Sequence, residues 1–243
     1  MFDPDIQKYK TVVMQRIQQA ASRGYIYYTS GEIPLSKATN LANKFAVLYE
    51  IDANENRRSY KKRKGEANGF LYLFPKKNSD NFHWWLMATE GTGDIHNSEK
   101  LIKIFDKHNR LNWNDDYELL LVPKINGKHS ISWRMTRKCY QEWNDRIRKS
   151  IRQRYNDDKA KQAIWSLSRA PGFSGIREQV KNLYKLYAGE WKRSRKQTGE
   201  APKLPPIGYV RGLKSETIPL SLMVTRLKKG LRPFPRTDSN QEA

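Results

Sequence analysis

The sequence predicts an α+β fold: a central antiparallel sheet of about four to five strands, N-terminal helices and a C-terminal basic helical region. Three observations support this prediction. Short runs rich in aromatic and β-branched residues recur between residues 25 and 135. Two of these runs are joined through Asn126-Gly127, a dipeptide typical of a type I′ hairpin turn. From Thr136 the apolar spacing changes to three and four residues and stays helical to about residue 197.

Two helices are expected near the N-terminus. The first covers residues 3–24, with Asp3 as its cap and Pro4 in the first helical position. The second covers residues 35–51, with Ser36 as its cap. Its expected inward positions are Leu41, Phe45 and Leu48.

Five segments are predicted as strands: 25–29, 69–74, 83–89, 117–123 and 129–135. The first is expected to end at the Ser-Gly-Glu sequence that follows it, because these residues favour turns. Residues 97–108 are expected to form a helical insertion between strands. The hairpin-type links favour antiparallel pairing.

Four helices are expected after the strands. They begin at Thr136, at about Asp157, at Ser174 and near residue 221, and the last ends at Gly230. The expected buried positions of the first helix are Tyr140, Trp143, Ile147 and Ile151. Those of the second are Ala160, Ile164 and Leu167, and those of the third are Ile176, Val180, Leu183, Tyr187 and Trp191. We expect residues 1–135 and residues 136–230 to pack as one compact unit, followed by a flexible tail at 231–243.

The charge balance is the strongest indication of function. The 243 residues contain 46 Lys and Arg against 25 Asp and Glu, a net charge of +21. Such an excess favours a polyanionic partner, either nucleic acid or an anionic membrane surface. No apolar run of about 18 residues and no signal peptide is visible, so we expect no membrane partner.

The single cysteine, Cys139, excludes an intrachain disulfide and a Cys-rich zinc site. We therefore expect a cytoplasmic protein, associated with the nucleoid in a bacterium or located in the nucleus in a eukaryote.

The positive charge is concentrated on predicted helices. Residues 134–196 contain eighteen Lys and Arg and six Asp and Glu. The basic residues that recur on one helix face are Arg148 and Arg152 on the first of these helices, and Arg177, Lys181, Lys185, Lys192 and Lys196 on the third. A solvated face is the alternative interpretation, but such faces usually mix charges of both signs. We therefore expect these faces to contact phosphates.

The second basic helix carries an aromatic residue between two cations. Lys161, Trp165 and Arg169 recur every four residues. Trp165 can stack on an unpaired base while its neighbours contact phosphates. We favour the alternative, in which Trp165 packs at the edge of the core, because large aromatic side chains are mostly buried.

The densest basic segment is residues 57–65. Its candidate contacts are Arg57, Arg58, Tyr60, Lys61, Lys62, Arg63 and Lys64. The segment has no hydrophobic periodicity, so we expect a mobile connecting loop that becomes ordered against phosphates. A nuclear-localisation tract and a solvated loop are the alternatives.

A catalytic metal site is weakly indicated. The candidate ligands are Asp94, His96 and Glu99, together with Asp115, Asp116 or Glu118. Their spacing matches no compact nuclease motif, so we predict no metal and no cofactor. The Gly-containing segment 89–94 lacks the pattern of a phosphate-binding loop and is expected to form a tight turn.

These observations together predict a nucleic-acid-binding protein, with DNA favoured because long basic helices fit the major groove. It would be an accessory factor in DNA replication, transfer or regulation, within a larger nucleoprotein assembly. A metal-dependent nuclease or RNA-processing enzyme is one alternative. An assembly component whose basic faces bind acidic proteins is the other.

Overall fold

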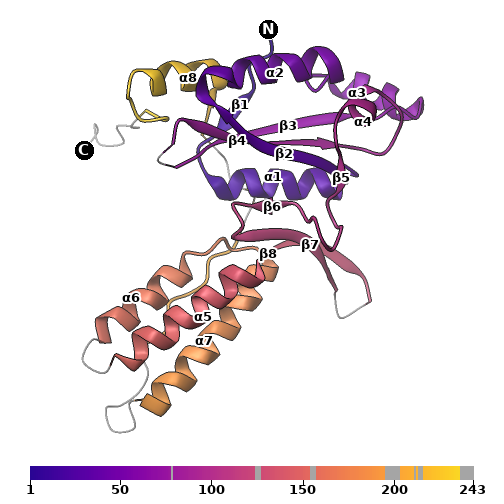
Figure 1. Ribbon diagram of the computed structural model, residues 1–243. Coiled ribbons are helices and arrows are strands. Elements are labelled where there is room, and N and C mark those ends of the chain that lie inside the picture. Colours follow the sequence, from indigo (N-terminus) through magenta and orange to yellow (C-terminus); the bar gives the residue numbers. More distant parts are fainter. Residues whose placement is uncertain are drawn as a thin grey trace, which may run out of the picture. The chain divides into compact units, whose positions relative to one another are not determined.

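The structure is a computed structural model that describes residues 1–77, 79–123, 127–153, 157–194, 203–210, 212 and 216–235. Its contacts divide the chain into two compact units. Unit 1 comprises residues 1–104 and 213–243, and unit 2 comprises residues 105–212. Helices and antiparallel sheets occur in both, which confirms the predicted α+β class (Figure 1). This division groups residues 105–135 with the basic helices that follow them.

A four-stranded antiparallel sheet forms the centre of unit 1. Its order is β3 (Gly69–Pro75), β4 (Asn81–Ala88), β2 (Tyr27–Pro34) and β5 (Ile102–Lys103). The predicted strands at 69–74 and 83–89 are confirmed. The predicted end of the first strand is wrong, because β2 continues through Gly31 to Pro34. The Trp84 indole covers Gly31, and a Cβ there would lie 3.0 Å from the ring. This glycine therefore makes room for an aromatic neighbour instead of ending the strand.

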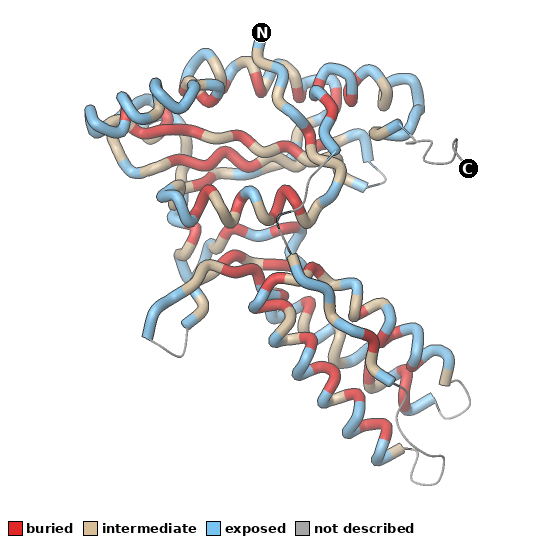
Figure 2. The backbone as a smooth tube through the Cα atoms, turned by 180° about the vertical axis from the view of Figure 1, so that it is seen from behind, coloured by how far each residue is buried: buried red, intermediate tan, exposed pale blue. Residues whose placement is uncertain are grey.

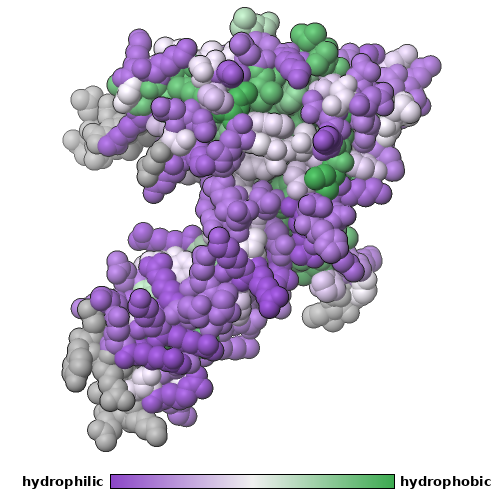
Figure 3. Space-filling model, in the orientation of Figure 1, coloured by the Kyte–Doolittle hydropathy of each residue, from purple (hydrophilic) through white to green (hydrophobic). Residues whose placement is uncertain are grey.

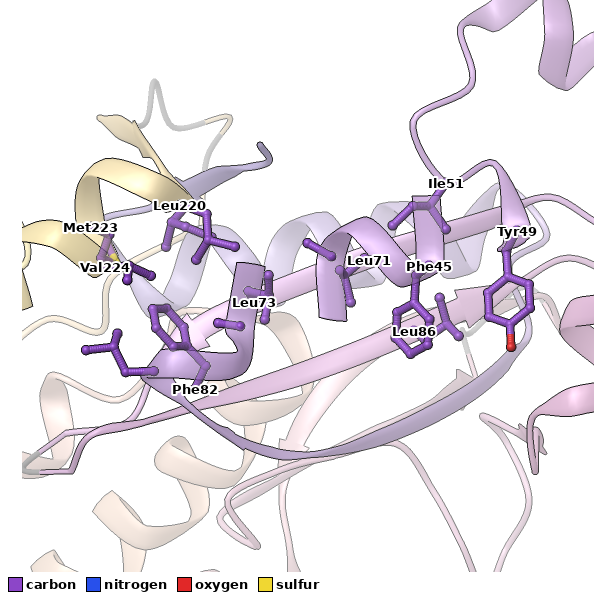
Figure 4. Close-up of a cluster of buried hydrophobic side chains, with 14 of the residues drawn as sticks. Phe45, Tyr49, Ile51, Leu71, Leu73, Phe82, Leu86, Leu220, Met223 and Val224 are labelled. Atoms are coloured by element: carbon purple, nitrogen blue, oxygen red, sulfur yellow. The ribbon is translucent and has the colours of Figure 1, made fainter. Parts of the chain in front are cut away.

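One face of this sheet is covered by α2 (Leu35–Tyr49) and α8 (Leu220–Lys228) (Figures 1 and 4). Phe45 of α2 is buried among Leu71 and Leu86 of the strands, as Figure 4 shows. The prediction for Leu48 is wrong: its side chain is exposed, because α2 turns that position away from the sheet. The short final helix is confirmed, and Gly230 after it has a φ of 65°.

The N-terminus forms a strand where the sequence predicted a helix. β1 (Asp5–Gln7) pairs with β9 (Thr217–Pro219), and α1 begins later and covers Lys10–Ser22. The predicted cap, Asp3, accepts hydrogen bonds from the Ser221 backbone N–H at 2.8 Å and hydroxyl at 2.6 Å. It therefore caps α8, about two hundred residues away in the chain, and no local pattern reveals this partner.

The remaining helices of unit 1 also differ from prediction. Residues 55–63 form a helix, α3 (Glu55–Arg63). The predicted helix at 97–108 is wrong, because α4 (Asp94–Ser98) ends at its beginning and β5 follows. The predicted tight turn at 89–94 is instead a bent connection from β4 to α4, and Thr92 in it forms an isolated bridge with Glu66. Thr92 N–H donates to the Gly65 carbonyl, and Gly91 and Gly93 have φ values of 138° and 135°.

Unit 2 contains its own three-stranded antiparallel sheet, where the sequence predicted a single sheet. The order is β6 (Asn112–Trp113), β7 (Tyr117–Pro123) and β8 (His129–Met135). The strands at 117–123 and 129–135 are confirmed. In the predicted turn, Gly127 has a φ of 72°, and Asn126 lies outside the described residues.

Three helices follow: α5 (Arg137–Arg152), α6 (Asp157–Ser168) and α7 (Ser174–Ser194). Thr136 caps α5 as predicted, since its hydroxyl accepts from Cys139 N–H at 3.2 Å. The buried positions of α6 and α7 are as predicted, whereas Tyr140 and Trp143 of α5 are only half-buried. Buried positions recur along each helix between exposed ones (Figure 2).

The side-chain amide of Gln179 fixes α7 to the last strand of its sheet. It accepts from Met135 N–H at 2.6 Å and donates to the Met135 carbonyl at 3.1 Å. Gly175 provides the close approach, because a Cβ there would lie 2.7 Å from the Trp133 carbonyl. The exposed side of α7 is thereby held in a defined orientation within unit 2. From residue 236 the predicted tail lies outside the described residues.

Candidate nucleic-acid interface

Among the described residues, α7 carries a run of basic side chains away from its buried stripe. Lys181, Lys185 and Lys192 lie on the exposed side and half-buried Arg177 lies at its edge, and we call these four residues the α7 cationic face. The three lysines are exposed, and none of them forms an ion pair within the described ranges. The predicted extension, Lys196, lies outside those ranges. Figure 3 shows a hydrophilic surface over the visible side of α5–α7.

Arg177 differs from the three lysines in having an aromatic partner. Its guanidinium carbon lies 3.4 Å from the centroid of the Tyr209 ring, and Tyr209 is itself 64% exposed. This cation–π contact restricts the rotamers of Arg177. Arg177 is half-buried and its Nε is buried, so it is less accessible than the three lysines.

Arg148 and Arg152 of α5 surround a buried carboxylate that the sequence analysis missed. Glu190 Oε1 lies 3.6 Å from Arg148 Nε, and Oε2 lies 3.7 Å from Arg152 Nη2. Arg193 Nη2 also donates to Oε1, at 2.7 Å. The predicted pair is thus brought together, but it contributes to α5–α7 packing as well as to the surface charge. The sequence signal that could have revealed Glu190 is its position beside Trp191, within the apolar stripe of α7.

Trp165 is exposed, so the favoured prediction that it packs at the edge of the core is wrong. Its exposed fraction is 58%. The reason is helical geometry: α6 buries Ala160, Ile164 and Leu167, and position 165 falls on the opposite side. Lys161 lies on the same side as Trp165 and pairs with Asp158 at 3.2 Å, and exposed Arg169 follows the end of the helix. The structure thus leaves an indole ring in solvent between two cations.

The basic segment 57–65 is largely helical, so the predicted connecting loop is wrong. Helix α3 begins after Asn54, whose side-chain oxygen accepts from Arg57 N–H at 2.9 Å. Three of its five basic residues, Lys61, Lys62 and Arg63, lie in the last turn, where they interact favourably with the helix dipole. Capping and charge placement therefore support a helix that lacks an apolar stripe.

Two of the α3 cations are engaged by Glu50, and others are in solvent. Arg57 Nη2 contacts both Glu50 oxygens at 2.9 and 3.1 Å, and buried Lys61 Nζ lies 3.0 Å from Oε2. The Lys61 hydrogen bond, followed by that of Arg57, holds the pKa of Glu50 below its usual value. The centroid of the Tyr60 ring lies 5.6 Å from the Arg57 guanidinium carbon and 5.9 Å from Lys64 Nζ. The exposed basic residues of this segment are Arg57, Lys62, Arg63 and Lys64.

The acidic residues considered for a metal have other contacts. Glu99 accepts from the Tyr49 hydroxyl at 2.7 Å. Glu118 lies 3.0 Å from Arg110 and 3.6 Å from Arg134. In the part of the chain that the structure describes, no group of three or more His, Cys, Asp or Glu side chains is placed to hold a metal ion. We therefore assign no ligands there.

A cavity of about 690 Å³ in unit 1 was also missed by the sequence analysis. Its lining includes Arg16 of α1, Arg23 directly after that helix, Arg58 of α3, and Phe70 and Tyr72 of β3. Only Arg58 was among the predicted contacts. The available signal was the alternation in residues 69–74, which places Phe70 and Tyr72 on one side of a strand.

Comparisons with family models, with curated proteins and with solved structures find no match to this chain. None of the helices within the described ranges is long and apolar enough to cross a membrane.

Proposed function

We propose that this protein binds nucleic acid, with DNA favoured, and that the α7 cationic face contacts the phosphates. The observation that carries the proposal is the set of exposed lysines at 181, 185 and 192, which have no acidic partner in the described part of unit 2. Like charges one helical turn apart repel by a few tenths of a kcal/mol. Phosphates remove that repulsion, and counterion release then favours binding.

The dimensions of α7 suit a duplex. Lys181 and Lys192 are eleven residues apart, which corresponds to about 16 Å along the helix axis. B-DNA carries roughly ten phosphate charges over that axial length. A straight helix with cations along one side can therefore contact several phosphates without distortion.

Each unit also contains a further candidate contact of its own. On α3, Lys62, Arg63 and Lys64 are exposed cations next to Tyr60. On α6, the exposed indole of Trp165 provides a surface on which an unpaired base can stack. This feature favours an additional contact with single-stranded segments. Such a protein would act as an accessory factor in DNA replication, transfer or regulation, located with the cell's nucleic acid in the nucleoid or nucleus.

A salt titration tests the proposal. Binding to labelled duplex DNA, single-stranded DNA and RNA is measured first in EDTA and then in Mg²⁺. The proposal predicts affinity in EDTA that falls steeply with salt, since each phosphate contact contributes about 0.9 to the slope of log K against log salt. Fragments that appear only in Mg²⁺ would indicate a nuclease instead. If none of the three ligands binds at low salt, the proposal fails and the lysines fit an acidic protein surface.

A further inference from the structure

The 690 Å³ cavity lies at the open edge of the unit 1 sheet. The outer strand of that sheet is β3, and α1 lines the cavity on one side. Residues 51–59 and β1 also contribute to the lining. Its volume falls within the range of about 300–1,000 Å³ that is usual for small-ligand sites. The cavity can therefore hold a group of nucleotide size.

An aromatic surface forms part of the cavity wall. The rings of Phe70 and Tyr72 stack at 5.0 Å with planes 19° apart, and Tyr25 meets Phe70 edge-on at 6.1 Å. The three rings are half-buried, so each is partly open to solvent. Stacked rings of this kind offer a π-face to a nucleobase of any sequence.

Arg58 has unmet hydrogen-bonding capacity at this wall. Its guanidinium carbon lies 4.7 Å above the Phe70 ring, and its Nη2 donates to the Ile51 carbonyl at 2.8 Å. The Arg58 Nε is buried and has no partner within the described residues. Gln7 also lines the cavity, and its Oε1 is buried and has no hydrogen-bond partner among the described residues. A ligand with both acceptors and donors would satisfy the two atoms.

Two further arginines approach the cavity from α1. Arg16 and Arg23 are seven residues apart, on the same side of the helix, and both are exposed. Burial raises the pKa of Tyr72, while the charges of Arg16, Arg23 and Arg58 act in the opposite direction. All three arginines line the same cavity as Tyr72. This arrangement places positive charge beside the aromatic surface.

The cavity also has acidic lining, which limits the ligand. Asp5, Asp52 and Glu55 lie on β1 and in the segment that leads into α3. They would repel a continuous row of phosphates, but they can accept hydrogen bonds from base N–H groups or sugar hydroxyls. Mixed lining of this kind suits a single nucleotide, which has an anionic end and a hydrogen-bonding end.

We infer that the cavity binds one unpaired nucleotide of a single-stranded nucleic acid. Its base lies against Phe70 and Tyr72, and its phosphate contacts Arg16 and Arg23. This inference rests on the proposed function and assigns a single-strand site to unit 1. An extended peptide could instead pair with the open edge of β3. The stacked rings and the three guanidinium groups favour the nucleotide.

The experiment compares two double variants. R16A/R23A removes the phosphate contacts, and K37A/K100A removes two exposed lysines of the same unit that do not line the cavity. Anisotropy with a labelled 12-nucleotide single strand should show about a tenfold loss for R16A/R23A and at most about a twofold loss for the control. Duplex affinity should be similar in the two variants.

A second measurement does not depend on the variants. NMR spectra of the wild-type chain are recorded during titration with adenosine 5′-monophosphate, and shifts are expected at Tyr25, Phe70 and Tyr72. If the 12-mer binds with equal affinity to both double variants and these residues do not shift, the cavity assignment alone is wrong. If wild-type protein binds no polynucleotide, the proposed function is wrong. Shifts caused by an acidic ten-residue peptide, but not by the nucleotide, would overturn the assignment in favour of strand addition.

Discussion

Glu190→Gln removes the buried charge that α5 and α7 share. The Glu190 side chain is 7% exposed and accepts from Arg193 at 2.7 Å. A hydrogen bond between charged groups contributes about 1.5–3 kcal/mol, and the 68% exposure of the Arg193 side chain places this one at the lower end of that range. The Arg148 and Arg152 side chains are 44% and 65% exposed, so solvent screening reduces each longer contact to a few tenths of a kcal/mol. We expect the variant to lower the free energy of unfolding by about 2 kcal/mol.

Urea unfolding measures this change. Tryptophan fluorescence reports mainly on unit 2, because five of the seven tryptophans lie there and Trp113, Trp133 and Trp191 are buried; Trp84 and Trp85 add a signal from unit 1. With a denaturant slope of about 1–3 kcal/mol/M, the midpoint should fall by roughly 1 M. The control is Glu178→Gln, which removes the same charge from an exposed position on α7 and should change stability by less than about 0.5 kcal/mol. Equal midpoints for the two variants would refute the structural role of Glu190.

Three further predictions concern single positions. The pKa of Tyr49 is raised to about 12 by burial and then by its hydrogen bond to Glu99, whereas an unfolded tyrosine titrates near 10. Tyr49 should therefore account for about 1 kcal/mol of the stability that the protein loses from pH 10 to 11, and Y49F should lose about 1 kcal/mol less than wild type over this range; equal losses would contradict this. G91A should lower the free energy of unfolding in urea by about 2 kcal/mol or more, because its Cβ would lie 2.6 Å from a backbone nitrogen. The control is G93A, which has a similar φ but no atom within 4 Å of the added Cβ, and it should lower that free energy by about 1 kcal/mol. Equal losses in the two variants would contradict the steric explanation. W165A should weaken single-strand binding about tenfold without changing the thermal midpoint, and an equal loss of duplex affinity would contradict base stacking.

The helices that bury a regular stripe could be predicted from sequence. In α7, Val180, Leu183 and Tyr187 define the buried side, and the lysines at 181 and 185 then fall on the exposed side. Helix α3 could not be predicted in this way, because its stability depends on the Asn54 cap and on Glu50, and no apolar period marks it. The same limit applies to Asp3, whose partner is on the last helix.

The candidate site was only partly predictable for a related reason. Spacing places cations on a helix side, but it does not show what packs beside them. Arg148 and Arg152 therefore appeared free until the tertiary fold placed Glu190 next to them. Trp165 appeared buried because aromatic residues usually are, although the helix turns it into solvent. The cavity is lined by four separate segments between residues 2 and 73, so no single motif indicates it.

The salt dependence of DNA binding by a triple variant of α7 tests the central claim most directly. K181A/K185A/K192A removes the exposed lysines of the α7 cationic face. The control, K37A/K100A/K229A, removes three exposed lysines of unit 1, so the net charge of the two proteins is equal. If the lysines contact phosphates, the negative slope of log K against log salt should become shallower by about two to three for the α7 variant and by less than about one for the control. Equal slopes and affinities in the two variants would contradict the proposed interface.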